Sequence, residues 1–129
     1  MKALLTNYRQ SPRKVRLVAD LIRGKSIAQA KAALKYLPKK SSPAIERLLD
    51  SAVANARSRG IGPENLIVGK ITVDKGTVMR RYRPFARGRA GSVRKTMSIV
   101  NLELAMAKPK AAKKANIAKP TAKKGDETK

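Results

Sequence analysis

Residues Lys75 to Lys95 read KGTVMRRYRPFARGRAGSVRK, and the other elements of the chain are best understood in relation to this segment. Eight of its residues are Lys or Arg, and none is Asp or Glu. Its few apolar residues are scattered, so it cannot bury a core of its own. Runs typical of β-strands bracket it, Leu66 to Val73 before and Met97 to Leu104 after. This arrangement predicts a long β-hairpin arm over about residues 74–97 that leaves the body of the protein.

The expected length of the arm implies a partner. Extended chain advances roughly 3.3 Å per residue, so twelve residues out and twelve back reach about 40 Å. A body of about 75 residues has a radius of gyration of only about 11 Å. Because a free hairpin of this length is marginally stable in water, we expect a partner that supplies burial and negative charge. The alternative is a basic loop that never becomes ordered.

The charge of the whole chain points to a polyanion. The 129 residues carry a net charge of +23, divided as +10, +7 and +6 over residues 1–74, 75–104 and 105–129. Such self-repulsion disfavours the isolated compact state, and Lys and Arg replace the counterions of a phosphate backbone. No apolar run of membrane-spanning length and no signal peptide is found, so we expect no membrane partner and a cytoplasmic location.

The first 63 residues predict a short strand, Ala3 to Tyr8, and three amphipathic helices. A Ser-Pro pair is expected to open the first helix at Ser11 and the third at Ser42. Ser26 and Gln29 match a capping box for the second. The predicted buried faces have helical spacing. They are Val15, Val18, Ala19 and Ile22, then Ala30, Ala33, Leu34 and Leu37, then Ile45, Leu48, Leu49, Ala52, Val53 and Ala56. The expected fold class is α+β, with three helices packed on a small antiparallel sheet and a long protruding β-hairpin arm.

The last segment and the missing residue types narrow the function further. Residues 105–129 repeat Lys, Ala and Pro, which predicts a disordered basic tail that acts as an electrostatic tether. The chain has no histidine and no cysteine, which removes Ser-His and Cys-His nucleophiles and the usual zinc ligands. Ser11 and Lys14 match an S-x-x-K pattern, but a helix cap explains Ser11 better. We expect no catalytic residue, no metal and no cofactor.

The arm has the composition of a nucleic-acid-binding segment. Its arginines outnumber its lysines six to two, and guanidinium groups bind phosphate bidentately and stack on bases. The predicted contacts are Lys75, Arg80, Arg81, Arg83, Arg87, Arg89, Arg94 and Lys95. Tyr82 and Phe85 are candidates for base stacking. Strand alternation makes both faces basic, which favours insertion into a folded RNA. A second predicted site lies on the body, at Arg13, Lys14, Arg16 and Lys25.

Several stretches together resemble the bacterial L22 (uL22) family of large-subunit ribosomal proteins. They are Ser11 to Lys25, Leu49 to Ala56, Asn65-Leu66, Val73-Asp74 and Arg83 to Ala90, in order across residues 1–104. Two positions depart from the family pattern. Phe85 stands where the family usually has Arg, and Thr96-Met97-Ser98-Ile99 lacks the usual histidine.

The resemblance implies a function as well as a fold. Residues 1–104 would form an RNA-binding domain that binds large-subunit ribosomal RNA, supports assembly and contacts neighbouring ribosomal proteins. Its hairpin would line the polypeptide exit tunnel and meet the nascent chain. The tunnel-side tip implied by position comprises Met79, Arg80, Arg81, Arg83, Pro84, Gly88, Arg89 and Ala90.

Two rival classes remain open from the sequence. An architectural DNA-binding protein would place a basic β-arm in the minor groove, with Pro84 or Phe85 as a wedge. Such proteins usually dimerise, whereas this chain shows no extra apolar face, so we expect no homo-oligomer. The second rival is a protein that binds polyanions non-specifically through its tail.

Overall fold

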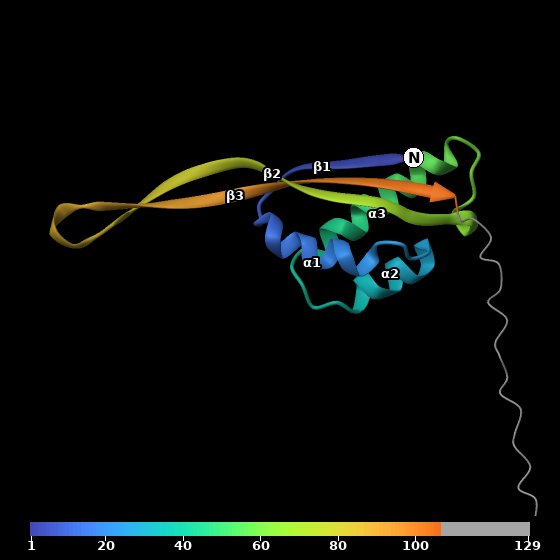
Figure 1. Ribbon diagram of the computed structural model, residues 1–129, viewed down its shortest axis with the longest axis horizontal. Helices are drawn as coiled ribbons and strands as arrows, with labels where there is room; N and C mark the ends of the chain where they lie inside the picture. The colour runs from blue at the N-terminus through green and yellow to red at the C-terminus, as the bar shows by residue number, and fades with distance from the viewer. Residues whose placement is uncertain (107–129) are drawn as a thin grey trace, which may run out of the picture.

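The computed structural model describes residues 1–106, so all but the first two residues of the predicted tail lie outside the described residues. The elements are β1 (Lys2–Tyr8), α1 (Pro12–Ile22), α2 (Ile27–Tyr36), α3 (Ser42–Arg57), β2 (Leu66–Pro84) and β3 (Ala90–Met106), with short 3-10 turns at Pro63–Asn65 and Ala86–Gly88. The antiparallel sheet has the order β1-β3-β2. The three helices cover one of its faces, and β2 and β3 continue far beyond them (Figure 1). The predicted α+β fold is confirmed.

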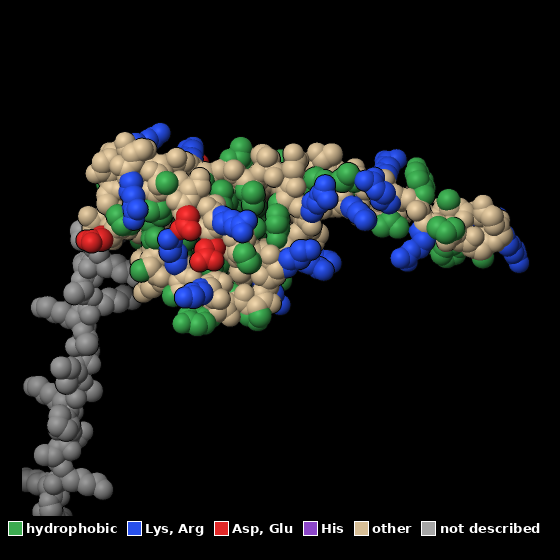
Figure 2. Space-filling model, turned by 180° about the vertical axis from the view of Figure 1, so that it is seen from behind, with side chains coloured by type: hydrophobic (Ala, Val, Ile, Leu, Met, Phe, Trp, Pro, Cys, Tyr) green, Lys and Arg blue, Asp and Glu red, His purple; other side chains and the backbone are tan. Residues whose placement is uncertain are grey.

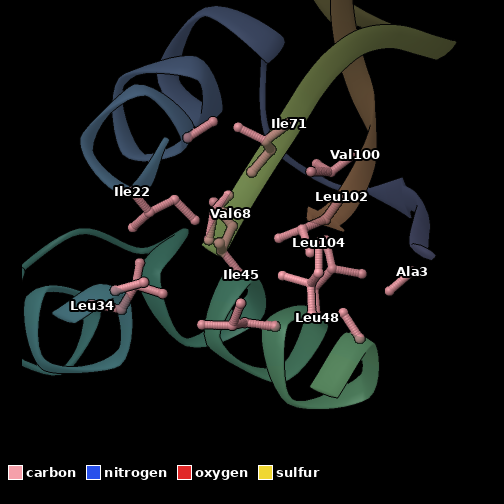
Figure 3. Packing of buried hydrophobic residues seen from close by; sticks show 14 of the residues in the cluster. Ala3, Ile22, Leu34, Ile45, Leu48, Val68, Ile71, Val100, Leu102 and Leu104 are labelled. Atoms are coloured by element: carbon pink, nitrogen blue, oxygen red, sulfur yellow. The ribbon is translucent and has the colours of Figure 1, made fainter. Parts of the chain in front are cut away.

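The core lies between the helices and the covered face of the sheet. On β2 and β3 alternate residues point into it, as strand geometry requires. The buried apolar strand residues are Ala3, Leu66, Val68, Ile71, Val73, Val100, Leu102 and Leu104. Figure 3 shows side chains from all three helices meeting those of the strands. The faces predicted for the first and third helices are buried in full, and on α2 Ala33 and Leu37 are half-buried. Helical periodicity thus identified the core correctly.

The predicted helix caps are correct at one helix only. The Ser26 hydroxyl accepts a hydrogen bond from the Gln29 N–H at 3.4 Å. At α1, Ser11 has the expected extended backbone but its side chain makes no cap hydrogen bond. At α3, the cap position is Ser41, one residue before the predicted Ser42, and Ser41 already has helical dihedral angles. That backbone does not aim a hydroxyl at the first-turn N–H groups, which explains the wrong prediction.

Hydrogen bonds from α1 and from the residues that follow it occupy backbone carbonyls on the outer edge of β2. The Gly24 N–H donates to the Val68 carbonyl at 2.9 Å. Arg23 Nη2 donates to the Ile71 carbonyl at 3.2 Å, and Arg16 donates to the Val73 carbonyl from Nε at 3.1 Å and Nη2 at 2.9 Å. These groups occupy carbonyls that another strand would otherwise bind, so Arg16 and Arg23 protect a sheet edge.

A bulge interrupts the β2–β3 pairing in the body. Val68 pairs with Leu104 and Lys70 with Glu103, so Gly69 is the extra residue. A Cβ atom at Gly69 would lie 2.8 Å from the Cβ of Ala105. The bulge therefore depends on a residue without a side chain at this point.

Within residues 1–106, none of the helices is long and apolar enough to span a bilayer.

We predict that Arg16→Ala lowers the free energy of unfolding by about 1–2 kcal/mol, because hydrogen bonds from a charged donor contribute on that order. Arg13→Ala, an exposed change one turn away, should stay within about 0.5 kcal/mol of the parent. Urea unfolding followed by circular dichroism measures both. Equal stabilities for the two variants would contradict the role assigned to Arg16.

We also predict that Gly69→Ala destabilises the protein by about 1–3 kcal/mol, as overpacking does. Ala105→Gly in the same chain should restore most of the loss, because it removes the atom that the new Cβ meets. Gly62→Ala is the matched control, since its Cβ would meet nothing within 4 Å. The same urea titrations test this, and failure of Ala105→Gly to rescue would show that the contact is not the cause.

Candidate nucleic-acid interface

The arm is the part of the β2–β3 hairpin that begins at Lys75, at the register shift between Lys75 and Val78. Its strands pair from Val78 with Thr96 to Pro84 with Ala90. No helix covers this part of the hairpin (Figure 1). The arm is therefore held by its backbone hydrogen bonds and cross-strand side-chain pairs.

The tip of the arm is a 3-10 turn over Ala86–Gly88. The Phe85 N–H donates to the Arg89 carbonyl at 2.7 Å and closes the turn. Arg87 and Gly88 both have left-handed backbones, with φ of 58° and 68°. Gly88 therefore serves the turn, whereas Gly91 pairs with Arg83 in the ladder.

All eight cations predicted on the arm are exposed. The three ion pairs found within residues 1–106 involve none of them. Figure 2 shows Lys and Arg side chains along the arm, while the acidic side chains on that view lie on the body. Tyr82 and Phe85 are each 71% exposed. The arm thus presents uncompensated positive charge and two accessible aromatic rings.

Like charges face each other directly across the arm. Arg80 pairs with Arg94 in the ladder. Together with Lys75, Val78 and Thr96 they line a hollow of about 380 Å³. Directly opposed like charges destabilise a strand pair, and an anion between them reverses the sign of that interaction.

The other face of the arm is also basic. It carries a hollow of about 180 Å³ lined by Arg9, Met79, Arg81, Lys95, Thr96 and Met97. The structure therefore brings basic side chains to both faces of the arm, as strand alternation predicted.

The four predicted body residues do not form one site. Arg13 and Lys14 are exposed at the start of α1, near the base of the arm. Arg16 donates to Val73 and is partly engaged within the protein. The Lys25 carbonyl accepts from the Val68 N–H at 2.9 Å, near the end of β2 that lies away from the arm.

Sequence reasoning missed two cations that the fold brings to the base of the arm. Arg9 follows β1 and Lys40 precedes α3, and both line a hollow with Lys14, Arg94 and Lys95. They lie 31 residues apart on connecting segments without periodicity. Nothing in the local sequence signals that they meet.

In the described part of the chain, no cluster of three acidic, histidine or cysteine side chains is arranged to hold a metal ion. The site consists of exposed cations around shallow hollows, which suits binding of a polyanion.

Comparison with known proteins agrees with this geometry. The family model of ribosomal protein L22p/L17e matches residues 3–105. The chain is 49% identical over 102 residues to large ribosomal subunit protein uL22 of Herpetosiphon aurantiacus, covering 78% of this chain and 90% of that protein. It is 46% identical over 107 residues to the uL22 protein of Pelobacter propionicus, covering 82% and 96%. The chain belongs to the L22p/L17e family of ribosomal proteins.

Proposed function

We propose that this protein is a structural constituent of the large ribosomal subunit that binds large-subunit ribosomal RNA, supports assembly and lines the polypeptide exit tunnel with its arm. Its place is the ribosome in the cytoplasm, beside neighbouring ribosomal proteins. Family membership supports this assignment and the prediction that the protein is not an enzyme.

The observation that carries the RNA-binding proposal is the unpaired charge of the arm. Eight exposed cations lie on a hairpin that has no core and no acidic partner among residues 1–106. Phosphates that enter between Arg80 and Arg94 relieve their repulsion and release counterions from the RNA. The arm is therefore most stable when RNA surrounds it.

The two faces of the arm fit an enclosed position better than one groove of a duplex. Arg80 and Arg94 lie on one face, and Arg81 and Lys95 on the other. The exposed rings of Tyr82 and Phe85 are available to stack on unpaired bases of a folded RNA.

The tip is proposed to meet the nascent polypeptide. Its residues are far from the helical body, and most are exposed (Figure 1). The segment proposed for the tunnel wall comprises Met79, Arg80, Arg81, Arg83, Pro84, Gly88, Arg89 and Ala90.

The body is proposed to dock on RNA through Arg13, Lys14, Arg16 and Lys25, and to act as a monomer. The apolar faces of the helices pack against the sheet, and Val15, Ile45 and Leu49 are fully buried there. Among the described helix residues, the large apolar side chains left exposed are Leu17, Leu21 and Tyr36, which are fewer than the interface of a stable dimer requires.

The experiment that tests the function is ultraviolet crosslinking in cells, with both the nucleic acid and the crosslinked peptide identified. We expect crosslinks from the peptide that spans Arg80 to Lys95 to large-subunit ribosomal RNA. Crosslinks spread over genomic DNA would overturn the proposal in favour of an architectural DNA-binding protein. Crosslinks confined to residues 105–129 would favour the non-specific tail binder.

We further predict that Arg80→Ala with Arg94→Ala reduces the salt dependence of binding to large-subunit ribosomal RNA transcribed in vitro. Two lost phosphate contacts should lower the slope of log affinity against log salt by roughly 1.4–1.8. Arg57→Ala with Arg59→Ala removes the same charge from the exposed end of α3 and should leave the slope nearly unchanged. Filter binding at several salt concentrations measures both. Equal slopes for the two variants would refute direct contact by the Arg80–Arg94 pair.

A further inference from the structure

A hollow of about 390 Å³ lies where the arm leaves the body, and we name it the root hollow. It is lined by Arg9, Gln10, Ser11, Lys14, Lys40, Arg94, Lys95 and Thr96. Its five cations come from four segments: the end of β1, the start of α1, the α2–α3 loop and the arm strand of β3. None of the lining residues is acidic.

The walls of the root hollow are fixed by hydrogen bonds between these segments. The Tyr8 hydroxyl donates to the Lys40 carbonyl at 3.1 Å, which ties the α2–α3 loop to β1. The buried Ser98 hydroxyl donates to the Gln10 carbonyl at 2.5 Å, which ties β3 to the turn before α1. Burial raises the pKa of the Tyr8 phenol, so the donor keeps its proton. The cations are therefore brought together by the fold and not by chance proximity of loose side chains.

No acidic side chain among residues 1–106 neutralises this cluster. The ion pairs of the described residues join Lys2 to Glu103, Arg23 to Asp20 and Lys31 to Asp50. The Ser11 hydroxyl makes no helix-cap hydrogen bond, so it remains a donor at the rim. The positive end of the α1 dipole adds to the same field.

The root hollow continues the basic surfaces of both faces of the arm. Arg94 lines it and also lines the hollow that holds Lys75 and Arg80. Arg9 and Lys95 line it and also the hollow on the opposite face. A polyanion strand that follows either face of the arm toward the body therefore passes through the root hollow.

We infer that the root hollow holds a backbone phosphate of the bound RNA, and that this phosphate links the body to the arm. The inference rests on the proposed RNA-binding function and adds a specific site to it. Lys14, Lys40 and Arg9 contact the phosphate from the body, and Arg94 and Lys95 contact it from the arm. One shared anion then fixes the direction in which the arm leaves the body.

The first test compares the full chain with Arg9→Ala plus Lys40→Ala, using in vitro transcribed large-subunit ribosomal RNA. Between 50 and 200 mM salt, the affinity of the variant should fall by up to roughly threefold less than that of the parent, because the contacts to one shared phosphate are weakened. Arg57→Ala plus Lys35→Ala is the matched control, since it also removes one exposed Arg and one exposed Lys. Thermal unfolding followed by circular dichroism verifies that both variants fold.

The second test asks whether body and arm share one phosphate. The affinity loss of Lys40→Ala plus Lys95→Ala should be at least about twofold smaller than the product of the two single losses, because contacts to one group are not independent. Lys40→Ala plus Arg89→Ala, which joins the root to the tip, should give the full product.

The outcomes separate this inference from the function on which it rests. If the parent binds ribosomal RNA and the Arg80–Arg94 variant weakens it, while the root-hollow variant matches its control, only the root hollow is refuted. If the body and arm losses multiply fully, the shared phosphate is refuted. If the parent fails to bind ribosomal RNA, both proposals fall.

Discussion

The antiparallel pairing of β2 with β3 is the interaction on which the rest of the structure depends. One ladder runs from Leu66–Met106 in the body to Pro84–Ala90 at the tip. In the body, Val68, Ile71 and Leu102 bury their side chains under the helices. In the arm the same ladder has no cover, so its stability rests on backbone hydrogen bonds and on whatever surrounds it. The same pair of strands thus lies in the apolar core at one end and outside the helical body at the other.

Much of the fold follows from patterns that act over short distances. The spacing of Val15, Val18, Ala19 and Ile22 identified a buried helix face because a helix repeats every 3.6 residues. Helix caps were harder to predict, since a Ser hydroxyl binds the first turn only if its own backbone is extended. Ser26 meets that condition and Ser41 does not. The residue type alone does not tell which of these two serines has an extended backbone.

The candidate site also has one part that local sequence predicts and one part that only the fold brings together. The arm was predictable because the 21 residues from Lys75 to Lys95 contain eight cations and no acid, and a stretch of this kind has few other uses. The root hollow was not predictable, because Arg9 and Lys40 meet only through the packing of β1 against the α2–α3 loop. Arg16 has a role that its charge did not suggest: its side chain is exposed, and it also donates to the Val73 carbonyl.

The distribution of acids explains why body and arm are expected to become ordered in different ways. In residues 1–106 every ion pair lies on the body, so acids there offset part of the local positive charge. The body also holds the whole buried core of the described residues. Among residues 1–106 the arm has neither a core nor an acidic partner, so its free energy falls most when phosphates approach. Repulsion between its cations therefore destabilises the free hairpin, and phosphate contacts stabilise the RNA-bound hairpin. The final conformation of the arm thus depends on RNA binding.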